Sequence, residues 1–388
     1  MNMKRISRLH IVDAHCHPFL PEKESKPFES YLTLSDIPQR REDLTSTMLY
    51  KLVMRELSRF LEVKGEARIL EERQRRISDD PSTYINGLFD DAGIETLLVD
   101  SGYPFKEYTG YEIDLGFFKE LVGRQVHEIF RLETTVYGLL KELIPFDDAV
   151  EDMRLRIRDA VKGGVISLKS VIAYRTGLEY RNWPREVTKQ SWEEMMGLVK
   201  GGVKPGDVLS ARNNCSKSVY DTFLMTGIEE AGRLDVPIQI HTGMGDSPSM
   251  DLRISNPAHL YSLLQDERTK KAKIVLTHGG YPYAEEAAFL TSAYPNVYLD
   301  FSQTIPFISI GVKNRLFNLL EMAPTTKIMY GSDGFNIPEI HWFSAVQTKM
   351  ALKSLLPELT NQCICTEEEG LRIAENFLAD NAKRLYKV

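Results

Sequence analysis

Short apolar runs recur along the chain, and a helical spacing of apolar residues follows each of them. Runs of this length are typical of buried strands, and strands that alternate with helices predict a parallel (β/α)8 barrel. We therefore expect a single TIM-like barrel domain over residues 1–388. The eight runs cover residues 11–17, 94–100, 129–134, 165–169, 236–241, 274–278, 297–301 and 328–333.

Residues 18–80 interrupt this alternation directly after the first predicted strand. Prolines break residues 19–38 into a loop, whereas apolar residues at three- and four-residue spacings predict helices over 45–76. We expect a helical insertion. Loops at the carboxyl ends of barrel strands surround the active site, so the insertion is a candidate lid or pocket wall. A decorative subdomain or a dimer contact stays open as the alternative.

Charge and composition narrow the class of protein. The chain has 388 residues and a net charge of −7, which argues against nucleic acid or an anionic membrane as the partner. No apolar run has the length of a transmembrane helix, and the basic first residues lack the apolar segment of a signal peptide. The four cysteines show no disulfide or zinc-finger spacing. We expect a cytoplasmic protein that acts on a small molecule, with a homo-oligomer left open.

Residues able to bind a metal stand where the predicted strands end. His15 and His17 end the first strand, His241 the fifth and His278 the sixth, and Asp333 follows the eighth. On a strand, residues two apart point to the same face, so His15 and His17 would point together. The carboxyl ends of barrel strands meet at one face of the barrel. The sequence therefore predicts a metal site there.

The types of side chain indicate the metal and its chemistry. Imidazole and carboxylate ligands with an open position suit Zn²⁺, with Mn²⁺, Fe²⁺ and Co²⁺ as alternatives. His15, His17 and Asp333 would hold the ion, and His241 would be a further ligand. Metal binding lowers the pKa of water to about 7, and Asp333 would shuttle the proton. His278 would stabilise a substrate oxyanion or ligate a second metal.

Lys169 ends the fourth predicted strand, where its charge must face a cavity or a partner. A first interpretation is a carbamylated Lys169 that bridges two metal ions. In a second, a free ammonium binds a substrate carboxylate. In a third, Lys169 pairs with an acid such as Glu133. The sequence leaves all three open, with one metal ion expected unless Lys169 is carbamylated.

Taken together, these residues resemble the amidohydrolase superfamily. The chain is most similar to the amidohydrolase 2 group, and within it to the amidohydrolase-like half of nodulin/glutamine-synthetase-like fusion proteins. The resemblance covers residues 9–386 and implies a TIM-like barrel, a divalent metal and usually hydrolysis, although relatives also decarboxylate or isomerise. It rests on Asp13-x-His15-x-His17, Lys169, His241, His278 and Gly331-Ser-Asp333, and on the segments 169–178, 239–246, 251–257, 332–335, 338–339 and 381–386.

Two arginines on the predicted loops are candidate substrate-binding residues. Tyr174 and Arg175 follow the fourth strand, and Arg253 follows the fifth. A guanidinium group can bind a carboxylate through two parallel hydrogen bonds, which would make the substrate an acid. The alternative is that the arginines pair with loop acids such as Asp251.

These observations predict a metal-dependent hydrolase. It would cleave a C–N (amide) bond of a small carboxylate-bearing substrate through metal-activated water. A metal-dependent decarboxylase or other lyase on the same barrel is the first alternative. The second is a non-catalytic binding or scaffold barrel, against which the full set of ligand-capable residues argues.

Overall fold

The computed structural model describes residues 3–388 and contains an eight-stranded sheet in which each strand lies beside the next, in the order β1 to β8. The pairs β1–β2, β3–β4, β4–β5, β5–β6 and β6–β7 are parallel. Helices lie between the strands, so the predicted (β/α)8 barrel is confirmed. The strands are β1 (Ile11–Cys16), β2 (Ile94–Asp100), β3 (Gln125–Arg131), β4 (Ser167–Ser170), β5 (Ile238–His241), β6 (Ile274–Thr277), β7 (Val297–Asp300) and β8 (Ile328–Met329).

The third and eighth strands differ from the prediction. The eighth is predicted over 328–333, but β8 ends at Met329 and Asp333 lies in the chain beyond it. The apolar pattern predicts a strand over 129–134, but β3 spans Gln125–Arg131 and α8 (Leu132–Lys141) begins at the next residue. Residues 125–128 are partly exposed and mostly polar, so an apolar run does not mark them. Leu132 and Val136 instead form the buried face of α8. The prediction places Glu133 at a strand end, but it lies in the first turn of α8.

The described chain divides into two compact units. The first contains residues 3–127, 246–248 and 300–388, and the second contains residues 128–245 and 249–299. The helices of the first unit are α1 (Met3–Ser7), α2 (Arg41–Ser46), α3 (Met48–Leu61), α4 (Glu66–Asp79), α5 (Pro81–Ala92), α6 (Lys106–Thr109), α7 (Leu115–Val122), α16 (Thr304–Ile308), α17 (Val312–Met322), α18 (Pro338–Asn361), α19 (Glu367–Glu375) and α20 (Asn381–Tyr386).

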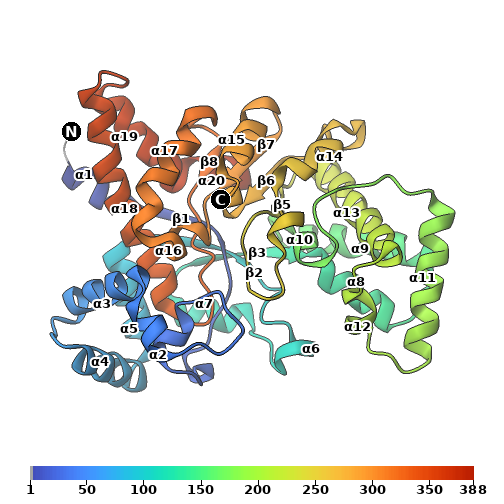
Figure 1. Ribbon diagram of the computed structural model, residues 1–388, viewed down its shortest axis with the longest axis horizontal. Coiled ribbons are helices and arrows are strands. Elements are labelled where there is room, and N and C mark those ends of the chain that lie inside the picture. Colours follow the sequence, from blue (N-terminus) through green and yellow to red (C-terminus); the bar gives the residue numbers. More distant parts are fainter. Residues whose placement is uncertain (1–2) are drawn as a thin grey trace. The chain divides into compact units, whose positions relative to one another are not determined.

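The insertion of the first unit is helical, as predicted. Short 3-10 turns at Pro21–Lys23 and Phe28–Tyr31 interrupt the proline-rich loop, and α2, α3 and α4 follow. The Thr47 side chain caps α3 by accepting a hydrogen bond from the main-chain N–H of Tyr50 at 3.2 Å. Figure 1 shows α3, α4 and α5, in blue to cyan, packed beside one another. The lid role of the insertion stays a prediction.

Arg73 attaches this insertion to α18. It is 3% exposed, and its guanidinium donates to both oxygens of Glu339 (2.5 and 3.0 Å) and to both oxygens of Glu24 (2.9 and 3.0 Å). The Tyr84 hydroxyl also donates to Glu339, at 2.7 Å. Glu339 is fully buried in the first turn of α18, where the helix macrodipole favours a carboxylate. One guanidinium therefore compensates two carboxylates that are removed from water.

The carboxyl-terminal segment packs against the last strand of the same unit. A helix is predicted over 366–386, and the structure has α19, a π-helical turn at Asn376–Asp380, and α20. The main-chain N–H of Tyr330 donates to the carbonyl of Phe377 at 2.8 Å, and the Asn381 amide donates to the carbonyl of Ile328 at 2.7 Å. These contacts hold the segment against the chain around β8.

Lys349 of α18 joins three segments of the first unit. It is 5% exposed, and its ammonium donates to the main-chain carbonyls of Ser7 (3.2 Å), Leu9 (2.7 Å) and Ala92 (2.7 Å). Ser7 and Ala92 are the last residues of α1 and α5, where helix macrodipoles favour a cation. Main-chain dipoles therefore offset part of the cost of burying this charge.

Replacing Lys349 with methionine is expected to lower the free energy of unfolding at neutral pH by about 2 kcal/mol, because three carbonyls lose their donor. Burial lowers the pKa of Lys349 from 10.5 to about 8. Between pH values of about 8 and 10.5, Lys349 is protonated in the unfolded chain and mostly deprotonated in the folded chain. The wild-type free energy of unfolding therefore rises with pH over this range. Below the lower value both states are protonated and this dependence vanishes.

Urea unfolding of the wild type and the Lys349 variant across this pH window measures the effect. The rise contributed by Lys349 should be absent from the Lys349→Met variant and present in Lys383→Met, which changes an exposed lysine of α20. Parallel curves for the wild type and Lys349→Met would contradict the assignment.

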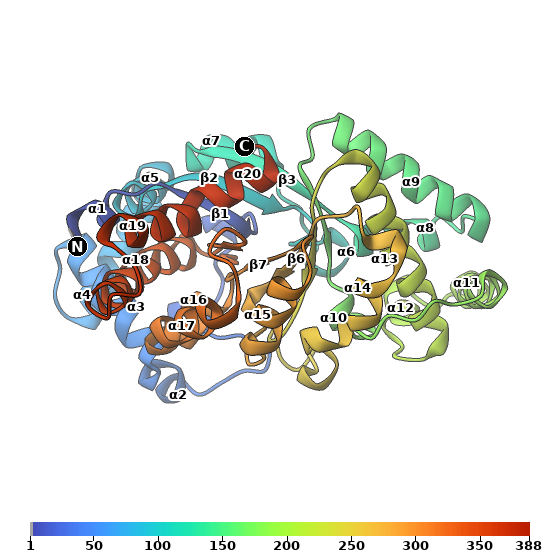
Figure 2. The ribbon, with the colours of Figure 1, turned by 90° about the horizontal axis from the view of Figure 1, so that it is seen from above.

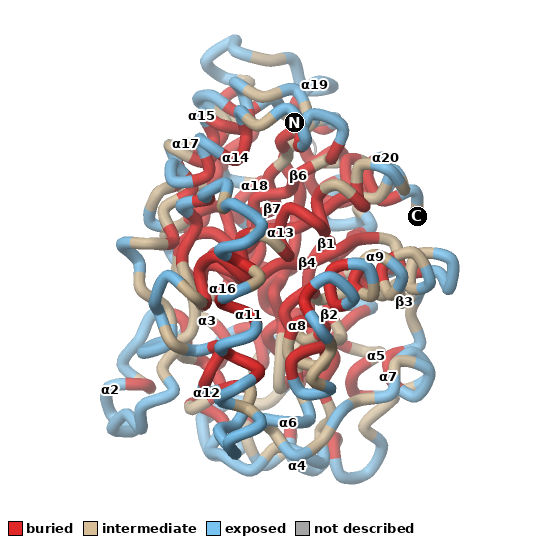
Figure 3. The backbone as a smooth tube through the Cα atoms, turned by 90° about the vertical axis from the view of Figure 1, so that its right-hand side faces the viewer, coloured by how far each residue is buried: buried red, intermediate tan, exposed pale blue. Residues whose placement is uncertain are grey.

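The second unit is built around the longest of its helices. Asn213 caps α13, and the neighbouring α9 and α11 pack against it, as Figure 2 shows for α9 and α13. In Figure 3 the strands are drawn mainly in red as buried, and helices carry the exposed residues. The helices of this unit are α8 (Leu132–Lys141), α9 (Phe146–Lys162), α10 (Ile172–Arg175), α11 (Arg185–Lys200), α12 (Pro205–Ser210), α13 (Asn214–Leu234), α14 (Tyr261–Gln265) and α15 (Ala284–Ala293).

Hydropathy adds one observation on the helices of both units. Among residues 3–388, none of the helices combines the length and the apolar character needed to cross a bilayer.

Candidate metal centre

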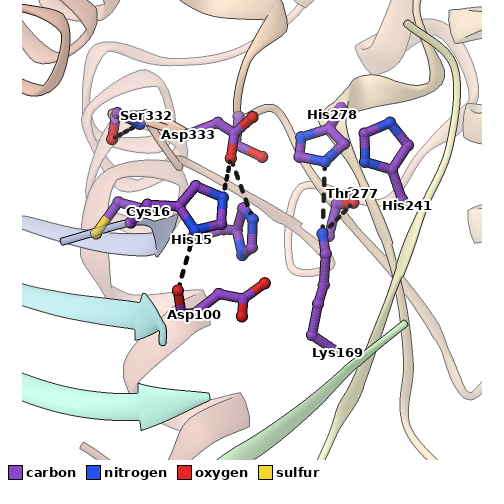
Figure 4. A network of polar contacts seen from close by, with 12 residues as sticks. His15, Cys16, Asp100, Lys169, His241, Thr277, His278, Ser332 and Asp333 are labelled. Atoms are coloured by element: carbon purple, nitrogen blue, oxygen red, sulfur yellow. Dashed lines mark hydrogen bonds and ion pairs between the residues drawn. The ribbon is translucent and has the colours of Figure 1, made fainter. Parts of the chain in front are cut away.

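Three of the predicted metal ligands lie together in the first unit. His15 Nε2 is 3.1 Å from Asp333 Oδ1, and His17 Nε2 is 3.3 Å from the same oxygen. Figure 4 shows the His15 ring directed at Asp333. The three residues, called the first-strand cluster below, are between 1% and 8% exposed. The structure thus brings Asp333 together with His15 of β1 and with His17, which directly follows β1. More than three hundred positions of sequence separate Asp333 from the two histidines.

The orientation of His17 is set by a main-chain carbonyl. Its Nδ1 lies 3.0 Å from the carbonyl oxygen of Asp100. A carbonyl can only accept a hydrogen bond, so the proton is assigned to Nδ1 and Nε2 keeps the lone pair that a metal needs. A hydrogen bond from the second ring nitrogen is the usual way in which proteins orient a histidine ligand.

Asp100 is a candidate ligand that sequence reasoning missed. It ends β2, and one of its carboxylate oxygens lies within 4.8 Å of a ring nitrogen of His15 and of a ring nitrogen of His17. Its Oδ1 also accepts a hydrogen bond from the main-chain N–H of Gly102 at 3.0 Å. The signal was present in the sequence, because Asp100 closes the second apolar run just as Asp333 closes the eighth.

The backbone of Asp333 is left-handed, with a φ of +49°. Residues other than glycine adopt this region at a cost of about 1–3 kcal/mol. The conformation is held by main-chain hydrogen bonds to the first strand and the residue after it. Asp333 N–H donates to the carbonyl of His15, and His17 N–H donates to the carbonyl of Gly334, both at 2.8 Å. The carboxylate is therefore aimed by its backbone as well as by its neighbours.

The first-strand cluster fits a small divalent ion. Bonds of about 2.0–2.2 Å at tetrahedral angles place ligand atoms about 3.3–3.6 Å apart. The separations of 3.1 and 3.3 Å between the imidazole nitrogens and Asp333 Oδ1 are close to that spacing. Two imidazoles and one carboxylate are also the donor types found around Zn²⁺ and neighbouring transition metals.

The second unit contains the remaining predicted strand-end residues. Lys169 is 1% exposed on β4, and its ammonium donates to Thr277 Oγ1 at 3.0 Å and lies 3.4 Å from His278 Nε2. The His241 and His278 rings are 4.2 Å apart between centroids. Figure 4 shows the Lys169 side chain extending towards Thr277 and His278. We call Lys169, His241, Thr277 and His278 the lysine cluster.

Two further contacts shape the lysine cluster. His241 Nε2 lies 2.8 Å from the carbonyl oxygen of Met244, which assigns the ring proton to Nε2 and leaves the lone pair on Nδ1. His278 follows β6 with a left-handed φ of +70°. Thr277 is the member that sequence reasoning missed, because a threonine inside an apolar run gives no signal of its own.

Glu133 lies beside this cluster. Its Oε1 accepts hydrogen bonds from the Ser170 hydroxyl at 2.7 Å and from the main-chain N–H of Val171 at 2.9 Å. Burial raises the pKa of Glu133, against the opposing effect of these two hydrogen bonds and of the nearby Arg175. The carboxylate thus holds the chain just after Lys169.

The two predicted substrate-binding arginines have different surroundings. Arg253 is exposed and donates to both oxygens of Asp251, at 3.0 and 2.8 Å, the pairing that the sequence left open as the alternative. Arg175 is half-buried at the end of α10, and its Nε is buried with no hydrogen-bond partner among residues 3–388. The preceding Tyr174 packs edge-on against His241, with 4.7 Å between ring centroids.

The fold and the two clusters define the class: a (β/α)8 barrel with histidines, acids and a lysine at the carboxyl ends of its strands. Residues 196–388 match a family model described as amidohydrolase, and over this half the chain belongs to that family. The resemblance to the amidohydrolase superfamily is thereby confirmed.

One curated relative is the fluG protein of Emericella nidulans. It is 30% identical over 234 residues, which are 60% of this chain but 27% of the relative. The chain thus spans about a quarter of that longer protein.

Solved structures support the fold over the whole chain. A presumed metal-dependent hydrolase from Lactobacillus casei is similar with a TM-score of 0.84 and 24% identity, covering 99% of this chain and 97% of the other. A uronate isomerase from Thermotoga maritima is similar with a TM-score of 0.69 and 13% identity, covering 99% and 96%.

Proposed function

We propose that the protein is a metal-dependent hydrolase that cleaves a C–N (amide) bond of a small carboxylate-bearing substrate. The observation that carries the proposal is the convergence of His15 Nε2 and His17 Nε2 on Asp333 Oδ1, in a chain whose carboxyl-terminal half matches the amidohydrolase family. The metal-dependent hydrolase with a similar fold supports it further.

The first-strand cluster would hold the ion in this proposal, with Zn²⁺ as the first choice and His241 as an additional ligand. When bound, a divalent ion lowers the pKa of a water molecule and polarises a carbonyl group. Asp333 takes the proton that the attacking water loses and delivers it to the departing amine. The water oxygen ends on the carboxylic acid product, and the amine leaves with the proton.

The lysine cluster would act on the same substrate. His278 would stabilise the oxyanion that develops on the carbonyl. Lys169 would either bind the substrate as an ammonium or, if carbamylated, hold a second ion.

The proposal also covers the location of the protein, its domain organisation and its partner. We propose a cytoplasmic location and a single barrel domain with residues 18–80 as a lid. We also propose that the partner is a small molecule, which the net charge of −7 supports by disfavouring nucleic acid and anionic membranes.

Elemental analysis of the purified protein, followed by a screen of N-acyl amino acids for release of the free amine, tests this function. We expect bound divalent metal and amine release that a chelator abolishes. A metal-containing protein that releases CO₂ from carboxylic acids instead would replace the hydrolase with the lyase alternative. A protein that binds no divalent metal would overturn the proposal.

The carboxylate preference of the substrate is assigned to Arg175. Arg253 already pairs with Asp251 in the exposed loop, whereas Arg175 follows the tyrosine that packs on His241. A guanidinium whose buried Nε has no hydrogen-bond partner among residues 3–388 is suited to a substrate carboxylate.

Replacing Arg175 with methionine is expected to raise KM about 10–100-fold with little change in kcat, because a charge-assisted pair contributes about 1.5–3 kcal/mol to binding. Arg253→Met is the matched control and should leave both constants near the wild type. Steady-state kinetics on the best substrate of the screen measures the difference. Equal effects of the two substitutions would remove Arg175 from the substrate site.

A further inference from the structure

A buried carboxylate that the proposed reaction does not use lies behind the first-strand cluster. Asp13 of β1 is fully buried, and both of its oxygens accept hydrogen bonds from Ser332. The Ser332 main-chain N–H donates to Oδ1 at 2.8 Å, and the Ser332 hydroxyl donates to Oδ2 at 2.5 Å. The main-chain N–H of His15 also lies 3.4 Å from Oδ1. Asp13 therefore contacts the backbone of His15, a proposed ligand, and Ser332, the residue directly before the proposed ligand Asp333.

Ser332 also contacts the residue that follows Asp333. Its hydroxyl oxygen accepts a hydrogen bond from the main-chain N–H of Gly334 at 2.8 Å. The residues on both sides of Asp333 are thus joined through one hydroxyl that Asp13 holds in place. Asp333 has its left-handed backbone between these two anchored residues. Without the hydroxyl, the segment would lose two of the contacts that oppose relaxation to an ordinary backbone.

The same region also has the composition of a second metal site. One donor atom each of Asp13, Cys16 and His341 lie within 4.8 Å of one another. However, Ser332 donates to both Asp13 oxygens, and the Cys16 thiol donates to the carbonyl of Leu98 at 3.6 Å. His341 Nδ1 lies 3.5 Å from the Ser332 hydroxyl and 3.9 Å from Asp13 Oδ2. Asp13 and His341 therefore both lie beside the serine hydroxyl, whereas the Cys16 thiol is hydrogen-bonded elsewhere.

We infer that Asp13, acting through Ser332, is a positioning residue that sets the geometry of the metal centre. The inference rests on the proposed function, because it requires that the first-strand cluster bind a metal. Residues outside the ligand set commonly change metal affinity by about 10–100-fold when they are replaced, since they orient the ligands. Asp13 is suited to that role because it links β1, which carries His15, to the segment that carries Asp333.

Binding of Co²⁺ to the metal-free wild type, Ser332→Ala and Asp13→Asn tests this role. We expect Co²⁺ to bind both variants about 10–100-fold more weakly and its visible absorption bands to shift, because the ligand geometry loosens. Ser344→Ala is the matched control. Ser344 is also fully buried in the first unit, and its hydroxyl donates to the carbonyl of Ile340. Its Co²⁺ affinity and spectrum should equal those of the wild type.

The outcomes separate this inference from the proposed function. Folded Ser332→Ala with wild-type Co²⁺ affinity and spectrum would overturn the positioning role, even if Asp13→Asn failed to fold. A weakening shared equally by Ser344→Ala would also overturn it, because any lost buried hydroxyl would then have the same effect. A wild type that binds no Co²⁺ would overturn the proposed function and with it this inference.

Discussion

Replacing His17 with alanine is expected to remove the metal and the hydrolase activity together. His17 presents Nε2 to Asp333 Oδ1 and is oriented by the carbonyl of Asp100. Loss of this ring deletes a ligand itself, so the drop in metal affinity should exceed the about 10–100-fold typical of changes around the ligands. Elemental analysis after dialysis, together with amine release from the screened substrate, measures both quantities.

The control for this substitution is His10→Ala. His10 has a side chain that is 64% exposed and pairs with Glu95, so its removal should leave metal content and activity unchanged. His15→Ala should behave as His17→Ala does. Full metal occupancy in both the His15 and His17 variants would rule out the first-strand cluster as the binding site.

Replacing Arg73 with methionine is expected to lower the free energy of unfolding by about 3–5 kcal/mol, because it leaves buried carboxylates without their cation. Glu339 is fully buried and Glu24 mostly so, and Arg73 donates to all four of their oxygens. Urea unfolding followed by circular dichroism measures the loss.

Arg75→Met is the matched control for this prediction. Arg75 lies on the same helix and its side chain is 59% exposed, so water screens its pairs with Glu72 and Asp79 and they contribute little to stability. If Arg73→Met does not fold, Tyr84→Phe removes only one hydrogen bond to Glu339 and should cost about 1–2 kcal/mol. Equal unfolding energies for the two arginine variants would contradict the role of Arg73.

Periodicity made the barrel predictable, because each buried strand and each amphipathic helix leaves its own pattern of apolar residues. The same logic predicted where His15, His17 and Asp333 would stand, and the first unit brings these three together. Position at a strand end is a local property that the sequence can show. The start of the third strand was not predicted, because the first half of that strand is polar and partly exposed.

The supporting contacts were not predictable in the same way. Asp13 meets Ser332 across 319 positions of sequence, and Arg73 meets Glu339 across 266. Hydrogen bonds of this kind leave no periodic signal, since any acid can pair with any donor that the fold brings near. Asp100 is different, because it closes an apolar run just as Asp333 does, and the sequence therefore marks both residues in the same way.

The left-handed backbone at Asp333 restricts which substitutions can be interpreted. Asparagine and glycine tolerate a φ of +49°, whereas alanine and branched residues are strained there. Asp333→Ala would therefore combine two effects, the loss of a carboxylate and a distorted turn. Asp333→Asn keeps the shape of the side chain and the preference of the backbone, so it isolates the contribution of the negative charge. Any comparison of natural or engineered variants at this position has to separate backbone tolerance from chemistry in the same manner.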